Sequence, residues 1–165
     1  GQYASWVGTL VRPDQSLLLL AEADRVEEAV MRLARVGYEN VAGVLGVDMA
    51  GWRAAGLPDA AMERLPVESW MHEGWNVLDV RRNREWNDFH IRGATHIPLA
   101  QLPDWLDQLD RAAAWVAICA SGYRSSIAGS VLQRAGFTRV ADGIGGMDAW
   151  RAAGLPLESG IPSGT

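Results

Sequence analysis

Cysteine and histidine are scarce in this sequence. Cys119 is the only cysteine among 165 residues, so the chain cannot form an internal disulfide. A reactive thiol of this kind needs reducing surroundings, and we therefore expect the protein to be cytoplasmic. The three histidines, His72, His90 and His96, lack the spacing to one another or to carboxylates that a metal site requires. We expect no metal and no cofactor bound to this chain.

Long apolar runs and an excess of positive charge are also missing. A membrane-spanning helix needs roughly 18 consecutive apolar residues, and the longest candidate here, residues 16–23, has only the length of a strand. The net charge of −5 leaves no basic stripe to neutralise phosphates. We therefore expect neither a membrane nor a nucleic acid as a partner. The content of 48% hydrophobic and 21% charged residues is ordinary for a globular protein.

Cys119 stands where one pattern gives way to another. The apolar run before it, residues 114–118, is short, as in a buried strand. Residues 124–135 carry apolar side chains at helical spacing, and Gly136 ends them. At a helix start, unpaired amides and the helix dipole favour an anion, and Arg124 adds positive charge. The pattern predicts a thiolate nucleophile in an anion-binding loop.

A lone cysteine can instead be a small buried apolar residue. Such a packing cysteine would not need Gly122 to let the backbone turn, nor an arginine at the end of the loop. We therefore favour the reactive interpretation of Cys119.

The loop CASGYRS at residues 119–125 resembles the active-site loop of rhodanese domains, the sulfurtransferases that carry a sulfane sulfur as a cysteine persulfide. The resemblance extends over residues 62–156, although Phe89 stands where the family usually has glycine. The other matching segments are NVLDVR at residues 76–81 with Glu85 and Trp86, HIRGATHIP at 90–98, GGMDAW at 145–150 and GLP at 154–156.

The expected fold is α/β and rhodanese-like, with a mostly parallel sheet and helices on both faces, because short apolar strands alternate with helical segments. The resemblance implies that Cys119 takes sulfur from a donor such as thiosulfate or glutathione persulfide and passes it to a thiol or cyanide. The residues expected to bind the substrate are Ala120, Ser121, Gly122, Tyr123, Arg124 and Ser125. We interpret Asp79, Arg81, Glu85 and Trp86 as scaffold near the loop.

Two other functions stay open. Phosphatases and arsenate reductases of related fold also use a cysteine and an arginine, but with five residues between them, whereas four separate Cys119 from Arg124. The smaller ring suits sulfur better than a tetrahedral phosphate. Alternatively, the chain is a non-catalytic sulfur carrier or docking module of a larger persulfide-oxidising protein.

A seven-residue segment occurs twice without change. Residues 52–58 and 150–156 both read WRAAGLP, and LARVGY at 33–38 recurs loosely as LQRAGF at 132–137. Such recurrence indicates a repeated structural unit. We expect the tryptophans that begin the two identical segments to anchor the last helix of each unit in its core.

The first copy lacks the nucleophile, because the alignment sets Leu20 on Cys119 and Arg25 on Arg124. Its expected elements are strands at residues 16–21 and 40–44, a helix at 25–36 with Asp24 as N-cap, and a final helix ending near Gly56. Nothing in residues 1–13 resembles the strand at 76–81, so this copy is incomplete.

We therefore predict a truncated, degenerate rhodanese-like half at residues 1–58 and a complete rhodanese domain at 59–165. This order resembles a fusion in which a metallo-β-lactamase-fold persulfide dioxygenase precedes a degenerate and then an active rhodanese unit. The resemblance implies an iron-binding domain upstream and Gly1 as a cut boundary. Because the half cannot cover its apolar faces, we expect it to pack on the complete domain or to form a homodimer with the same half of a second chain.

Overall fold

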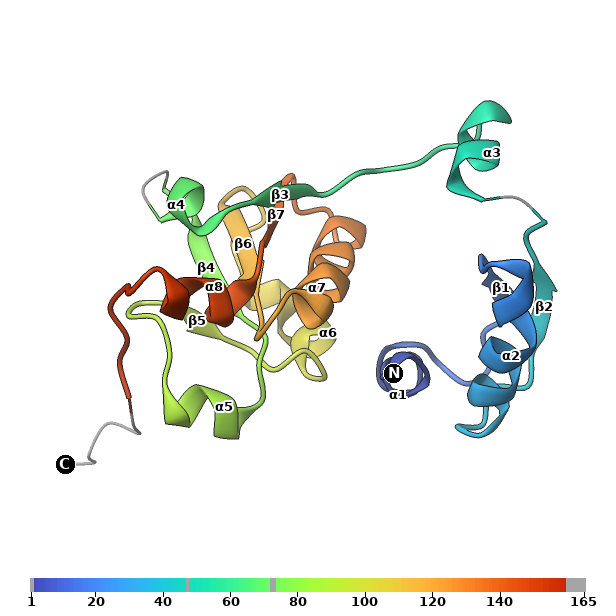
Figure 1. Cartoon of the computed structure of the whole chain (residues 1–165), viewed down its shortest axis with the longest axis horizontal. Coiled ribbons are helices and arrows are strands. Elements are labelled where there is room, and N and C mark those ends of the chain that lie inside the picture. Colours follow the sequence, from blue (N-terminus) through green and yellow to red (C-terminus); the bar gives the residue numbers. More distant parts are fainter. Residues whose placement is uncertain (1, 47, 72–73, 160–165) are drawn as a thin grey trace. The chain divides into compact units, whose positions relative to one another are not determined.

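The computed structural model describes residues 2–46, 48–71 and 74–159, so Gly1 and His72 lie outside the described residues. The chain divides into two compact units, residues 1–60 and 61–165, which are described separately (Figure 1). That the first unit is a degenerate copy of the second stays a prediction.

The first unit contains a small parallel pair of strands with helices before, between and after them. Its elements are α1 (Tyr3–Leu10), β1 (Leu17–Leu19), the 3-10 turn η1 (Ala23–Arg25), α2 (Val26–Ala34), β2 (Val41–Val44) and α3 (Met49–Ala54). The sequence did not predict α1. Its mixture of Tyr, Trp, Gly and Thr has weak helix propensity, and Tyr38 donates a hydrogen bond from its hydroxyl to the carbonyl oxygen of Val11, just after the helix.

Helix α2 begins and ends inside the predicted range. Asp24 is not its N-cap but lies within η1, because the Arg25 N–H bonds to the Glu22 carbonyl oxygen at 2.9 Å and winds the chain into a tighter turn. At its other end the last turn is also tighter, with Val36 N–H bonded to the Leu33 carbonyl oxygen at 3.0 Å. The Asp24 cap is therefore a wrong prediction.

The two units end their corresponding helices in the same way. Gly37 and Gly136 adopt left-handed φ angles of +86° and +89°. The following amides bond back across the turn, Tyr38 N–H to the Leu33 carbonyl oxygen at 3.0 Å and Phe137 N–H to that of Leu132 at 3.2 Å. The LARVGY and LQRAGF segments thus form one local structure in two places.

The identical WRAAGLP segments also share their contacts. The indole N–H of Trp52 bonds to the Pro58 carbonyl oxygen at 3.0 Å, and that of Trp150 to the Pro156 carbonyl oxygen at 2.9 Å. Trp150 is buried, as expected, but Trp52 is only half-buried. The core-anchor prediction is therefore wrong for Trp52, since the described part of its unit supplies no ring to stack on it.

The second unit is an α/β domain, as the sequence predicts. Its strands are β3 (Glu63–Leu65), β4 (Asn76–Asp79), β5 (Thr95–His96), β6 (Ala114–Ile118) and β7 (Arg139–Gly143). Its helices are α4 (Val67–Trp70), α5 (Asn83–Asp88), α6 (Leu102–Trp105) with the 3-10 turn η2 (Leu106–Gln108), α7 (Tyr123–Arg134) and α8 (Gly146–Ala152). These strands form one sheet in the order β3-β7-β6-β4-β5, and each neighbouring pair is parallel.

Helices cover both faces of this sheet, α4 and α8 on one side and α6 and α7 on the other (Figure 1). The α4/α8 side is a cluster of buried side chains that includes Val67, Trp70, Ile91, Val116, Ile118, Ala141, Met147 and Trp150. Within it the rings of Trp70 and Trp150 stack at 5.1 Å. On the other side, Ala128 and Leu132 of α7 are buried against β6 and β7. No helix within the described residues is long and apolar enough to cross a membrane.

Candidate active site

Cys119 follows the most deeply buried strand of the sheet. Every residue of β6 is buried, because β4 and β7 flank it and helices cover both of its faces. Cys119 is itself only 1% exposed. In parallel α/β sheets the carboxyl ends of central strands are where ligands bind and chemistry occurs. The fold therefore places the predicted nucleophile at such a site.

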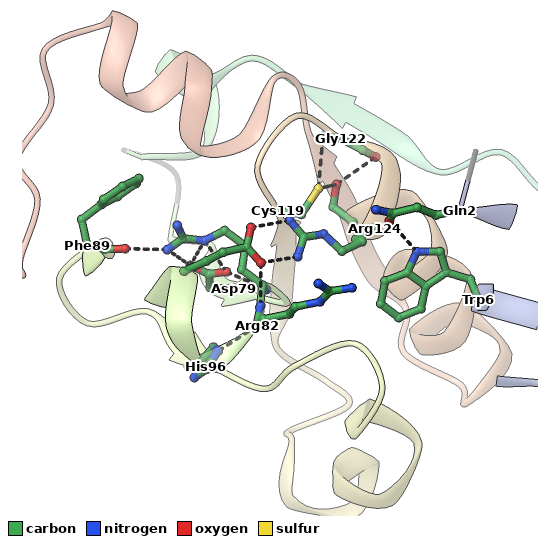
Figure 2. Close-up of polar contacts among 12 residues, drawn as sticks. Gln2, Trp6, Asp79, Arg82, Phe89, His96, Cys119, Gly122 and Arg124 are labelled. Carbon is green, nitrogen blue, oxygen red and sulfur yellow. Dashed lines mark hydrogen bonds and ion pairs between the residues drawn. The ribbon is translucent and has the colours of Figure 1, made fainter. Parts of the chain in front are cut away.

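Gly122 shapes the loop around the sulfur. Its φ angle of +114° lies in the left-handed region, where a side chain would be strained. In this conformation the Gly122 N–H donates a hydrogen bond to Cys119 Sγ at 3.1 Å, and α7 begins at the next residue (Figure 2). The loop thus presents a backbone donor and a helix start to the sulfur, as the sequence predicts for a cysteine that becomes an anion.

The start of α8 holds the other side of the loop. Met147 N–H donates to the Cys119 carbonyl oxygen at 2.8 Å, and Asp148 N–H donates to that of Ala120 at 3.0 Å. This approach needs Gly146, because a Cβ there would lie 2.2 Å from the Cys119 carbonyl oxygen. The start of helix α8 therefore holds the carbonyl groups of Cys119 and Ala120 in place.

Arg124 forms an ion pair with Glu85 of α5. Its Nη1 and Nη2 donate to the two carboxylate oxygens of Glu85, at 2.6 and 2.7 Å (Figure 2). These hydrogen bonds lower the pKa of Glu85 to about 2 and raise the pKa of Arg124, although partial burial opposes both shifts. The nearby Cys119 also raises the pKa of Arg124. Arg124 therefore stands beside the sulfur with a permanent counter-ion.

Asp79 and Arg81 form a buried pair beside this site. Both are at most 2% exposed. Asp79 accepts hydrogen bonds from the Arg81 side chain, at 2.7 Å from Nη2, and from the Arg81 backbone N–H at 2.9 Å. Arg81 Nη2 also donates to the Phe89 carbonyl oxygen at 2.7 Å (Figure 2). With its donors directed at these groups, Arg81 supports the chain between β4 and β5.

The remaining predicted binding residues occupy different depths. Ser121 and Tyr123 are exposed, Ala120 is half-buried and Ser125 is fully buried. Ser125 Oγ lies 3.6 Å from Cys119 Sγ and donates to Asp142 Oδ1 at 2.6 Å. Ser121 and Tyr123 thus lie at the surface of the loop, whereas Ser125 contacts the sulfur from inside the domain.

Two residues at this site escaped the sequence reasoning in these roles. The sequence predicts Glu85 only as scaffold, whereas it binds Arg124 of the Cys119 loop. Its position at the start of α5, just after strand β4, could have indicated that contact. Asp142 was not singled out, and the signal was an acidic residue among the apolar residues Val140 and Ala141 of the same strand. In the part of the chain that the structure describes, no three His, Cys, Asp or Glu side chains gather as metal ligands.

Comparison with known proteins decides the family. The model of the rhodanese-like domain matches residues 65–153, which is more than half of the chain. The chain belongs to the rhodanese-like domain family. The match includes the Cys119 loop, the β4 segment and the start of α8, so the geometry above is that of a rhodanese-like domain.

Curated relatives carry the same domain. Thiosulfate sulfurtransferase GlpE of Actinobacillus pleuropneumoniae serotype 3 (strain JL03) is 31% identical over 106 residues, which cover 62% of this chain and 98% of GlpE. YrkF of Bacillus subtilis (strain 168), whose name describes a sulfur carrier protein, is 30% identical over 105 residues. That match covers 64% of this chain but only 57% of YrkF, so the two proteins share a domain and not their full lengths.

Solved structures agree with the rhodanese-like fold. The solution structure of the rhodanese-like domain of the Alr3790 protein from Anabaena sp. has a TM-score of 0.55 at 30% identity, covering 64% of this chain and 85% of that one. A rhodanese-related protein from Thermoplasma volcanium also has a TM-score of 0.55, at 28% identity over 58% of this chain and 97% of its own.

Proposed function

We propose that this rhodanese-like domain is a sulfurtransferase that carries a sulfane sulfur as a persulfide on Cys119. The observation that supports it best is the position of Cys119, which directly follows the central strand β6 and accepts a hydrogen bond on Sγ from the Gly122 N–H at 3.1 Å. The donor is thiosulfate or glutathione persulfide, and the acceptor is a thiol or cyanide. Because the reaction needs a reduced thiol, the proposal places it in the cytoplasm.

The reaction has two half-reactions. The Cys119 thiolate attacks the outer sulfur of the donor, a bond forms between the two sulfurs, and sulfite or glutathione thiolate leaves with the electron pair of the broken S–S bond. The acceptor then attacks the same outer sulfur, and Cys119 leaves as a thiolate. The Gly122 N–H and the start of α7 stabilise the negative sulfur in both steps, and Arg124 supplies positive charge beside it.

Intact-mass measurement tests this proposal. After incubation with thiosulfate or glutathione persulfide, we expect a gain of one sulfur atom on Cys119, removed again by cyanide or glutathione. Because Cys119 is the only thiol, Cys119→Ser should abolish both the mass gain and the transfer while the protein remains folded. Transfer at more than a few per cent of the wild-type rate in this variant would disprove a Cys119 persulfide.

A sulfur carrier is the second candidate, because YrkF bears a name of that kind. A carrier would accept one sulfur from a partner enzyme but would turn over thiosulfate and cyanide slowly or not at all. The number of thiocyanate ions released per Cys119 separates the two functions. Many ions per chain support the transferase, whereas one ion per chain supports the carrier.

Phosphate chemistry has less support. The phosphatases and arsenate reductases that the loop resembles have five residues between the cysteine and the arginine, whereas four separate Cys119 from Arg124. We expect no release of nitrophenolate from p-nitrophenyl phosphate, and no reduction of arsenate.

For the first unit we propose a docking role. In the second unit β6 pairs with strands on both sides, whereas in the described residues of the first unit β1 pairs with β2 alone. Leu18 on β1 is 66% exposed. An unpaired edge with an exposed leucine supports a partner there. The family resemblance suggests a metallo-β-lactamase-fold persulfide dioxygenase domain, with its own iron, or a second copy of this chain.

A further inference from the structure

A row of hydrogen-bonding groups lies behind the Cys119 sulfur, on the side away from the loop mouth. Cys119 Sγ is 3.6 Å from Ser125 Oγ, and Ser125 Oγ is 2.6 Å from Asp142 Oδ1. The other carboxylate oxygen of Asp142 lies 3.4 Å from Arg64 Nε. Cys119, Ser125 and Asp142 are each at most 2% exposed, so all three are buried.

The protons in this row can be counted. A serine hydroxyl has one hydrogen and accepts with its lone pairs, whereas an ionised carboxylate only accepts. Two acceptors lie within reach of the Ser125 hydroxyl, the Gly122 carbonyl oxygen at 3.1 Å and Asp142 Oδ1 at 2.6 Å, and the shorter contact to the charged carboxylate takes the hydrogen. The lone pairs of Ser125 Oγ then face Cys119 Sγ, and in this arrangement Ser125 accepts a hydrogen bond from the thiol S–H. The row fits a neutral thiol joined to an ionised carboxylate.

We propose that Ser125 and Asp142 form a proton relay that takes up the thiol proton of Cys119. The S–H bond of Cys119 breaks and its proton passes to Ser125 Oγ, while the original hydroxyl proton of Ser125 passes to Asp142 Oδ1. Asp142 is then a neutral acid that donates to Ser125, and Ser125 donates to the Cys119 thiolate. Cys119 and Asp142 thus share one proton, and no atom changes oxidation state.

Charged and hydrogen-bonding groups face both ends of the row. Among the described residues, Arg64 of β3 faces Asp142, and Arg124 of α7 and the Gly122 N–H lie beside Cys119. Glu85 of α5 compensates the charge of Arg124. Asp142 therefore acts through Ser125 as a positioning residue, and Ser125 contacts the reacting sulfur. This role deepens the proposed sulfur transfer and rests on it for its purpose.

Sharing one proton has a distinctive pH signature. At low pH both groups are protonated, at intermediate pH one proton is divided between them, and at high pH neither holds one. The fraction of thiolate, and with it the rate of alkylation by iodoacetamide, must then rise in two steps with a plateau between them. Because the pKa of Glu85 is lowered to about 2, its titration does not interfere between about pH 5 and pH 10.

The experiment measures the alkylation rate of Cys119 across that pH range in the full chain. We expect two steps in the wild type, with an intermediate plateau between them. Asp142→Asn keeps the size of the side chain and its contact with Ser125 but removes the acid, so we expect a single step. Ser125→Ala removes the bridge and should also give a single step. Ser126→Ala, at a half-buried serine, and Asp148→Asn, at an exposed aspartate, change residues of the same kind outside the row and should keep both steps.

A single step in the wild type would overturn the relay, and this result needs no variant to fold. Two steps that persist in both Asp142→Asn and Ser125→Ala would overturn it as well. The measurement involves neither a sulfur donor nor an acceptor. Two steps without a persulfide on Cys119 would therefore retain the relay and disprove the proposed function. A single step together with a persulfide on Cys119 would disprove the relay and retain the proposed function.

Discussion

The guanidinium of Arg124 and the carboxylate of Glu85 join the Cys119 loop to α5 through two hydrogen bonds of 2.6 and 2.7 Å. A paired arrangement of this kind fixes the plane of the guanidinium as well as its position. Arg124 thus lies beside the sulfur in one orientation, and the Glu85 carboxylate balances its positive charge.

The pH dependence of stability should reveal this pair. The pKa of Glu85 is lowered from 4.5 to about 2 in the folded protein, so its contribution to stability is complete above about pH 4.5 and is lost as the pH falls towards 2. We expect the free energy of unfolding of the wild type to fall more steeply over that interval than that of Glu85→Gln. Urea unfolding at a series of pH values measures both slopes, and Asp107→Asn, in an exposed pair with Arg111, is the control. Equal slopes in wild type and Glu85→Gln would contradict the pairing.

Loss of Arg124 should affect donor binding more than folding of the loop. In Arg124→Ala the Gly122 N–H still reaches the sulfur, but a charge-assisted donor of about 1.5–3 kcal/mol is lost, which corresponds to about 10- to 100-fold. We expect KM for thiosulfate to rise by this factor while kcat changes less. Steady-state kinetics measures both constants, with Arg134→Ala at the exposed far end of α7 as the control. An unchanged KM would show that Arg124 only braces α5.

Gly146 offers a test of how α8 holds the loop. Gly146→Ala places a Cβ 2.2 Å from the Cys119 carbonyl oxygen, so the Met147 N–H bond to that oxygen must break. Gly154 also has a left-handed φ, of +67°, but a Cβ added there would have no atom within 4 Å. We expect about 1 kcal/mol of destabilisation from backbone strain in Gly154→Ala, and a larger one in Gly146→Ala together with loss of sulfur transfer. Thermal unfolding and activity of the two variants compare these costs, and equal stabilities and activities would refute this role of α8.

The open edge of β1 predicts association through the first unit. We expect the 165-residue chain to dimerise through residues 1–58, and a chain that begins near Ala61 to be a monomer. The shorter chain is a reasonable comparison, because the match to GlpE covers 98% of GlpE but only 62% of this chain. Light scattering measures both masses. A dimer that persists in the shorter chain, or a monomeric long chain with a protease-sensitive first unit, would contradict the prediction.

Local patterns explain why much of the second unit could be predicted. The apolar run before Cys119 is strand β6, Ala114–Ile118, and the helix predicted from residue 124 begins one residue earlier, at Tyr123. Both depend on neighbours in the sequence, since burial dictates the strand composition and Gly122 permits the turn into the helix.

Contacts between distant elements could not be predicted in the same way. Glu85 and Arg124 are 39 positions apart, and Ser125 and Asp142 are 17 apart. Their meeting depends on the order of strands in the sheet, which brings α5 and β7 to the Cys119 loop. Local reasoning also failed at Trp52, because burial is a property of the whole unit and not of the segment that contains the residue.

The two WRAAGLP segments have the same sequence and form the same internal contact in different surroundings. Each closes on itself through an indole N–H bonded to the carbonyl oxygen six residues later, although one tryptophan is buried in a core and the other is half-exposed. Since the closure survives this change of surroundings, the information for it lies within the segment. Bringing together two groups so close in the sequence takes about 10–100 ns, far less than the assembly of a parallel sheet. The ends of α3 and α8 can therefore form early in folding, before the strands that precede them have found their neighbours.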